Sequence, residues 1–154
     1  MKIEEILKKD FIIANLFSRR KQDALRELAE FLETKGIIQN QDTLYQALME
    51  RESLGSTGIG ENVAIPHAKS DEVKQILTVF GLSREGINFD SLDQKPVYYV
   101  CLLIAPTHST GLHLKALARI SKLLNSKILR QNILEVETTD DIYSILLDED
   151  AKLD

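Results

Sequence analysis

The residue best placed to carry covalent chemistry is His67, which follows a short apolar segment and a proline. The segment Val63 to Ile65 is predicted to be a strand, and Pro66 fixes its own φ and favours extended geometry in the residue before it. A histidine held at a strand end can project a ring nitrogen into a cleft. Because a neutral imidazole has a pKa near ~6.5, it is a competent nucleophile at physiological pH. A lone histidine is more often structural, so its surroundings must decide.

A glycine-rich segment, Leu54 to Gly60, precedes this strand and is predicted to be a loop. It is not a phosphate-binding P-loop, because a glutamate follows the last glycine where a lysine is required. It also lacks the third glycine of the dinucleotide fingerprint, so nucleotide binding is not expected. Two interpretations stay open. The segment is either a flexible connection or an anion-contacting loop in which Ser56, Thr57 and Gly58 offer N–H and hydroxyl donors.

Two further side chains are candidates for the same cleft. Arg51 continues the line of Leu44 and Leu48 on a predicted helix over 42–52, so it either extends to the surface or reaches into the cleft. A guanidinium would suit the oxygens of a phosphoryl group. His113 lies in the first turn of a predicted helix over 112–124, on its apolar stripe. It is either a core histidine or a site residue near the helix N-terminus.

Other candidate chemistries find little support. His108 lies in a polar loop and is expected at the surface, and Cys101 lies in the most apolar segment and is expected in the core. No short Cys/His spacing indicates zinc, and no Gly-x-Ser-x-Gly sequence surrounds Ser56. The sequence therefore predicts neither a metal site nor a serine hydrolase.

Composition narrows the class of protein. The chain has 154 residues, of which 44% are hydrophobic and 28% charged, with a formal net charge of −5. This charge argues against nucleic-acid binding. The one basic cluster, Arg19 to Lys21, is expected to be a solvated first helical turn. A single cysteine, no signal-peptide pattern and no apolar run long enough for a membrane helix together predict a cytoplasmic protein without membrane insertion.

Helical and strand patterns alternate along the chain. Strands are predicted over 11–16, 63–65, 76–82 and 97–104, and helices over 19–35, 42–52, 112–124 and 140–147. This alternation predicts the α/β class: one domain over residues 1–154, a single-domain sandwich in which a mixed β-sheet is flanked by helices on both faces.

The motifs resemble those of a known family. Residues 51–60 read Arg-Glu-Ser-Leu-Gly-Ser-Thr-Gly-Ile-Gly, and residues 64–68 read Ala-Ile-Pro-His-Ala. Together with Phe89-Asp90, Pro96-Val97, Ala105-Pro106 and the segment 113–118, they resemble the enzyme IIA domains of the fructose/mannitol class. These domains belong to the phosphoenolpyruvate-dependent sugar phosphotransferase system. Two departures, Glu61-Asn62 and Ala68, fall where relatives more often carry small residues.

The resemblance implies a function and roles for the candidate residues. His67 would be phosphorylated by phospho-HPr, with Arg51 and His113 beside it as catalytic residues. The phosphoryl group would then pass to an enzyme IIB component, without a cofactor or metal. An alternative is the nitrogen-regulatory branch, whose phosphorylation state controls partner proteins instead of sugar uptake. A third possibility, an unrelated anion-binding α/β domain, requires that His67 be inert. The motifs do not separate the first two and do not reveal a sugar.

Overall fold

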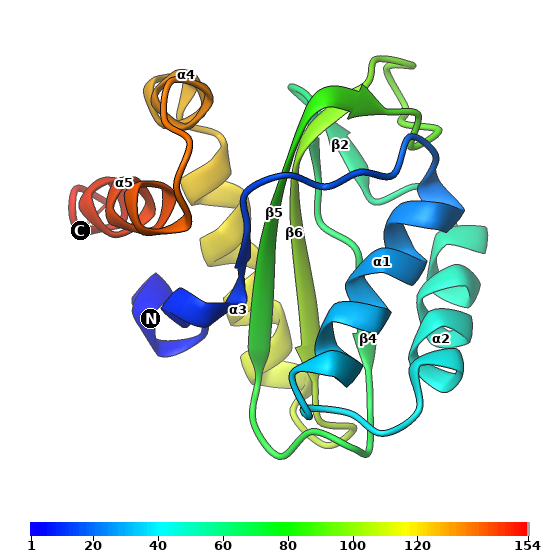
Figure 1. Ribbon diagram of the computed structural model, residues 1–154. Helices are drawn as coiled ribbons and strands as arrows, with labels where there is room; N and C mark the ends of the chain where they lie inside the picture. Colours follow the sequence, from blue (N-terminus) through cyan, green and yellow to red (C-terminus); the bar gives the residue numbers. More distant parts are fainter. Residues whose placement is uncertain (154) are drawn as a thin grey trace.

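The two longest apolar segments form the centre of a mixed sheet. The computed structural model describes residues 1–153, and its central strands are β5 (Leu77–Ile87) and β6 (Val97–Ala105), which pair antiparallel. Nearly every residue of both strands is buried, because helices cover both faces of the sheet. The predicted α/β sandwich with a mixed sheet is confirmed, and Figure 1 shows its three layers.

Four short strands complete the sheet on either side of this pair. β1 (Ile12–Ile13) pairs parallel with β5, while β3 (Val63–Ala64) and β4 (His67–Lys69) both pair parallel with β6. β2 (Gly58–Gly60) pairs antiparallel with β3. The same edge of β6 is therefore used twice, first by β3 and then by β4, with Ile65 and Pro66 between them.

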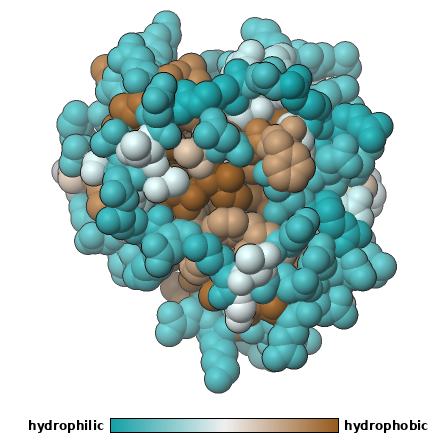
Figure 2. Space-filling view, viewed as in Figure 1, coloured by the Kyte–Doolittle hydropathy of each residue, from teal (hydrophilic) through white to brown (hydrophobic). Residues whose placement is uncertain are grey.

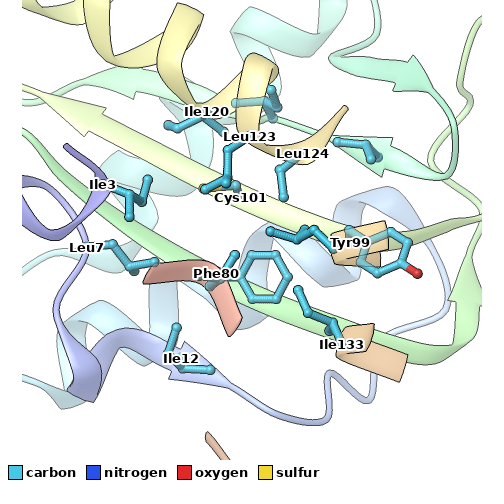
Figure 3. Packing of buried hydrophobic residues seen from close by; sticks show 14 of the residues in the cluster. Ile3, Leu7, Ile12, Phe80, Tyr99, Cys101, Ile120, Leu123, Leu124 and Ile133 are labelled. Atoms are coloured by element: carbon cyan, nitrogen blue, oxygen red, sulfur yellow. The ribbon is translucent and has the colours of Figure 1, made fainter. Parts of the chain in front are cut away.

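The helices divide between the two faces of the sheet, as Figure 1 shows. α1 (Lys21–Thr34) and α2 (Gln41–Ser53) cover one face. α3 (Thr110–Leu124), α4 (Lys127–Leu134) and α5 (Thr139–Ala151) cover the other, with the 3-10 turns η1 (Ile3–Glu5) and η2 (Lys9–Phe11). Each face has its own apolar core. Figure 3 shows the second one, where Phe80 and Tyr99 of the sheet meet Ile120 and Leu124 of α3.

Side chains cap the first turns of α2, α4 and α5. The Asn40 side chain accepts hydrogen bonds from two amides at the start of α2, and Thr138 accepts one from the amide of Asp141 at the start of α5. Gly36 follows the end of α1 with φ of 76°, the left-handed conformation that a glycine adopts without cost.

Several elements differ from the prediction. The strand predicted over 11–16 is reduced to β1, because Phe11 belongs to η2, and β4 was not predicted as a strand. The segment Leu54 to Gly60 was predicted to be a loop throughout, but its last three residues form β2. Glu61 and Asn62 then make the hairpin turn with φ of 55° and 65°. Both turn residues have positive φ, as a two-residue hairpin with right-handed strand twist requires. Helix α4 was not predicted. Its signals are the Ser126 cap and apolar residues at i, i+4 spacing.

Apolar side chains also reach the surface in front of β5. In Figure 2, which has the orientation of Figure 1, they gather in a central area that polar side chains surround. β1 is the edge strand here, and Ile13 and Ala14 are only half-buried. Within residues 1–153, no helix is both long enough and apolar enough to cross a membrane.

Candidate active site

His67 opens β4 instead of following the predicted strand. Its Cα pairs with that of Leu103 on β6, and the amide of Leu103 donates to the carbonyl of Pro66 at 2.9 Å. Because Pro66 has no N–H, it cannot extend a ladder through both of its backbone groups, and the chain separates into β3 and β4 at this point. The histidine is therefore held on the backbone side by the central strand β6.

Both ring nitrogens of His67 have defined partners. Nδ1 lies 2.8 Å from the carbonyl oxygen of Ile65, which only accepts, so Nδ1 carries the proton and donates it. Nε2 lies 3.1 Å from Nε of Arg51, which only donates, so Nε2 presents its lone pair. The two contacts select one neutral tautomer, as expected when a backbone carbonyl fixes one nitrogen.

Arg51 reaches the histidine from the last turn of α2, on the opposite side from its neighbour Glu52. Besides the contact with His67, its Nη1 donates to the carbonyl of Gly55 at 2.9 Å. This second bond orients the guanidinium plane, because two of its donors are fixed at once. The structure thus places Arg51 at His67 and not at the open surface.

His113 approaches His67 from the first turn of α3. The two rings are 5.3 Å apart between centroids and meet edge to face at 71°. His113 is buried, and among the described residues its Nδ1 has no hydrogen-bond partner. Burial lowers the pKa of His113 below 6.5, and the nearby charges of His67 and Lys69 lower it further. His113 is accordingly a neutral ring with an unused polar atom beside the first histidine.

These side chains line an open cavity of about 320 Å³. Its lining residues come from α2 and the residue that follows it, from β4 and from α3, and are Ala47, Glu50, Arg51, Leu54, His67, Ala68, Lys69 and His113. Sequence reasoning missed Lys69, although it stands two residues after His67 on the same strand and therefore on the same face. Its Nζ donates to the hydroxyl of Thr110 at 3.0 Å, so it is positioned at the rim as a second cation.

The three candidate anion-contacting residues of the loop, Ser56, Thr57 and Gly58, are not among the lining residues of this cavity. The Thr57 amide donates to Glu52 at 3.0 Å, and the Thr57 hydroxyl donates to the same carboxylate. Ser56 donates its hydroxyl to the carbonyl of Phe89, and Gly58 donates its amide to the Ser56 hydroxyl. The donors that made this loop a candidate anion site are engaged within the protein.

The carboxylate that holds Thr57 also binds a cation that sequence reasoning placed in solvent. Lys21 was expected in a solvated turn, but it is buried, and its Nζ lies 3.0 Å from Glu52. A lysine buried at this level needs a partner, which the sequence does not identify because Glu52 lies far along the chain.

The remaining candidates lie elsewhere. His108 is exposed in the turn before α3, as predicted. Cys101 is buried in β6, as predicted, and burial raises the pKa of its thiol to about 12. Within residues 1–153, no group of three or more His, Cys, Asp or Glu side chains is arranged to hold a metal ion.

The fold and the motifs around His67 define an EIIA domain of the sugar phosphotransferase system. Residues 5–149 match the family described as "Phosphoenolpyruvate-dependent sugar phosphotransferase system, EIIA 2". The chain belongs to this family, and it is an EIIA-type phosphoryl carrier.

Relatives come from both branches that the motifs suggested. The chain is 38% identical over 146 residues to the "PTS system fructose-specific EIIABC component" of Bacillus subtilis (strain 168), covering 95% of this chain but 23% of that protein. It is 37% identical over 147 residues to the "Nitrogen regulatory protein" of Bradyrhizobium diazoefficiens, covering 95% of each. The chain therefore spans less than a quarter of the first relative and nearly all of the second.

Solved structures share the fold. "Nitrogen Regulatory Protein IIA-Ntr" from Neisseria meningitidis has a TM-score of 0.85 and 33% identity, covering 94% of this chain and 98% of that one. The Escherichia coli complex of enzyme IIAMTL and phosphorylated enzyme IIBMTL contains a chain with a TM-score of 0.77 and 21% identity, covering 93% of this chain and 99% of that one.

Proposed function

We propose that the chain accepts a phosphoryl group from phospho-HPr on Nε2 of His67 and passes it to an enzyme IIB component. The observation that carries this proposal is the state of the His67 ring. Nδ1 donates to a carbonyl, and the lone pair of Nε2 faces Arg51 in an open cavity. A nucleophilic nitrogen must present a lone pair, and Nε2 is the one that does.

The transfer is an in-line displacement between two histidines. The Nε2 lone pair of His67 attacks phosphorus, the bond from phosphorus to the donor nitrogen breaks, and that nitrogen regains its electron pair. The proton on Nδ1 stays at the Ile65 carbonyl, so the ring keeps its orientation while its charge changes. Transfer to the next carrier reverses these steps, with the acceptor nucleophile attacking the same phosphorus.

Two cations and a neutral ring lie beside the place where the phosphoryl oxygens would be, and the cavity lining also includes Glu50. Arg51 gives up its contact with Nε2 when that nitrogen reacts, and its guanidinium is then available to the oxygens. Lys69 adds a positive charge at the rim. His113, neutral because its pKa is lowered, supplies a ring nitrogen without repelling the cations beside it. These groups are in place before the reaction, which is the arrangement that stabilises transferred charge most effectively.

The test is covalent labelling. Incubated with enzyme I, HPr and phosphoenolpyruvate, the wild-type chain should gain one phosphoryl group that is acid-labile and base-stable, as a phosphoramidate is. ATP alone should give no label. His67→Ala should abolish the modification, and His108→Ala should leave it intact as the matched control. Single-site labelling that persists in His67→Ala would refute the assignment.

A second candidate function is control of partner proteins by the phosphorylation state. It is favoured by the Bradyrhizobium relative, which is named a nitrogen regulatory protein and matches over nearly its full length. The two functions differ in the acceptor. Rapid transfer from the labelled chain to a purified IIB component supports the transport role. A label that no IIB accepts, together with a partner that binds only one phosphorylation state, supports the regulatory role.

A further inference from the structure

A buried ion pair lies directly behind the cavity. Lys21 Nζ and Glu52 Oε1 are 3.0 Å apart, and the two side chains are only 11% and 3% exposed. The ammonium also lies over the ring of Phe89, 5.1 Å from its centroid. The carboxylate of Glu52 accepts two further hydrogen bonds, from the amide and the hydroxyl of Thr57. The charges are therefore paired, and both carboxylate oxygens of Glu52 have partners.

A buried ion pair adds little net stability to a fold. Desolvating two charges costs as much as their attraction returns, and apolar residues of similar size often serve stability as well. What a buried pair provides is a defined geometry, because its partners tolerate little displacement. The role of the Lys21–Glu52 pair therefore depends on the groups that it holds in place.

The contacts lead from Glu52 to His67 through one backbone segment. Glu52 holds the Thr57 amide, and the Thr57 carbonyl accepts from the amide of Ile65 at 3.0 Å. The Ile65 carbonyl is the group that accepts the proton of His67 Nδ1. Thr57 bonds to Glu52 through its amide and to Ile65 through its carbonyl, and Ile65 bonds to Thr57 through its amide and to His67 through its carbonyl. A shift of Thr57 therefore moves the carbonyl that fixes the His67 tautomer.

The same segment orients Arg51. The guanidinium donates to the carbonyl of Gly55, two residues before Thr57. On its other side the segment packs tightly, since a Cβ on Gly58 would lie 2.1 Å from the hydroxyl oxygen of Ser91. The segment 55–58 is thus confined between Ser91 and Glu52, and both polar contacts of the His67 ring depend on where it lies.

We propose that Glu52 is a positioning residue for phosphoryl transfer. Lys21 is its buried counter-ion, and Thr57 is the residue that it holds by two hydrogen bonds. This inference rests on the proposed function of His67. Glu52 does not touch the phosphoryl group. It acts by fixing the segment 55–58, which holds Arg51 through Gly55 and the His67 tautomer through Ile65.

The test compares Glu52→Gln with a matched variant on the other face of the sheet. Arg119 and Asp150 form a second buried pair, with Nε and Oδ1 2.7 Å apart and exposures of 10% and 4%. Asp150→Asn removes the same charge without touching the segment 55–58. Both variants are expected to lower the melting temperature. Only Glu52→Gln should lower kcat for transfer from phospho-HPr, by about 10-fold, with KM unchanged, because a misplacement of ~1 Å can cost up to ~10²-fold in rate.

A second readout needs no phosphoryl donor. In the wild type, the ¹⁵N chemical shifts of His67 should be those of a fixed tautomer, with a protonated Nδ1 and an unprotonated Nε2. Glu52→Gln should bring the two shifts closer together, and Asp150→Asn should not. Since this measurement is made on the unphosphorylated protein, it tests the positioning role even where labelling of His67 fails.

Two milder variants cover the case in which Glu52→Gln does not fold. Thr57→Val keeps both charges and removes one hydroxyl donor, and it should change kcat and the His67 shifts in the same direction by a smaller factor. Lys21→Met combined with Glu52→Gln leaves no unpaired charge and should show the same two changes in a folded protein. Unchanged kcat and unchanged ring shifts in these folded variants would overturn the proposal, as would an equal loss of kcat in Asp150→Asn.

Discussion

The two sides of the His67 cavity are built in different ways. Arg51 arrives from α2, on one face of the sheet, and is held by two directional hydrogen bonds. His113 arrives from α3, on the opposite face, and is held by burial and an edge-to-face ring contact, with its Nδ1 unpartnered among the described residues. One side is fixed by polar contacts and the other by packing.

This difference follows from what each side must carry. A guanidinium stays charged, so it needs hydrogen-bond partners that hold and orient it wherever water does not. An imidazole can be buried because it can lose its proton, and the lowered pKa of His113 is the result. The charged group and the neutral group of this small site thus come from two different helical layers of the fold, which meet at β4.

Removing the polar side should have the larger effect. Arg51→Ala removes the side chain whose Nε donates to Nε2 of His67, and losing one preorganised donor typically slows a reaction by ~10²–10³-fold. Arg51→Lys should recover only part of the rate, since an ammonium cannot reproduce the planar fork. Quench-flow measurement of transfer from phospho-HPr gives both rates, and circular dichroism checks the fold. Full activity in Arg51→Ala would place the essential cation elsewhere, with Lys69 the next candidate.

Removing the packed side should slow transfer less and distinguish shape from chemistry. His113→Ala should slow transfer by ~10²-fold if the ring nitrogens serve the phosphoryl group. His113→Phe keeps a ring of similar shape in the same packed position but has no nitrogen. If His113→Phe transfers as slowly as His113→Ala, the ring nitrogens of His113 contribute to phosphoryl transfer. If Phe restores the rate, the second histidine acts by packing alone, and the two sides differ even more than their contacts indicate.

The pKa of His113 should respond to its neighbour. In the wild type it lies below 6.5, chiefly because of burial and then because of the charges of His67 and Lys69. His67→Ala should raise the pKa, but not to the ordinary value, because burial remains. An NMR titration of the His113 ring protons measures both values. An unchanged pKa would mean that the two rings do not sense each other electrostatically.

The same lowered pKa predicts how the stability depends on pH. Below pH 6.5 the unfolded chain binds a proton at residue 113 before the folded chain does. Stability from this group is therefore complete above 6.5 and declines as the pH falls toward the lower folded pKa. Chemical denaturation of His113→Phe, compared with the wild type between pH 7 and 5, should show a shallower decline. Parallel curves for the two proteins would contradict this prediction.

The smallest effect belongs to the third histidine. His108 is exposed in the turn before α3, and the cavity lining does not include it. His108→Ala should leave the transfer rate and the melting temperature unchanged within error. A slow His108→Ala protein beside a normal His113→Ala protein would reverse the assignment of the second histidine.

Some of this site could be predicted from the sequence, and the reason is local. His67 follows Pro66 in one short motif, and Arg51 and His113 lie on helix lines that period 3.6 makes visible. The central strands could also be predicted, because each is a long apolar run. The hairpin turn at Glu61 and Asn62 was not predicted, because Glu61 rarely adopts a positive φ and Asn62, which adopts it more readily, is a weaker signal than a glycine.

What escaped prediction is long-range pairing. Lys21 and Glu52 sit on different helices, and nothing in either neighbourhood indicates that the two charges meet in the interior. The same holds for the loop donors. Thr57 offers an amide and a hydroxyl that suit an anion, and the anion it binds is a carboxylate of the protein itself. Only the packing of α1 against α2 decides this.

The burial of Cys101 has a practical consequence. Cys101 is only 3% exposed and burial raises the pKa of its thiol to about 12, so both access and ionisation disfavour its reaction with a thiol reagent in the folded state. The wild-type chain therefore does not need its own cysteine replaced before a new cysteine is labelled. A cysteine introduced at the exposed His108 should react with a maleimide dye far faster than Cys101, which gives a fluorescent reporter in the turn before α3.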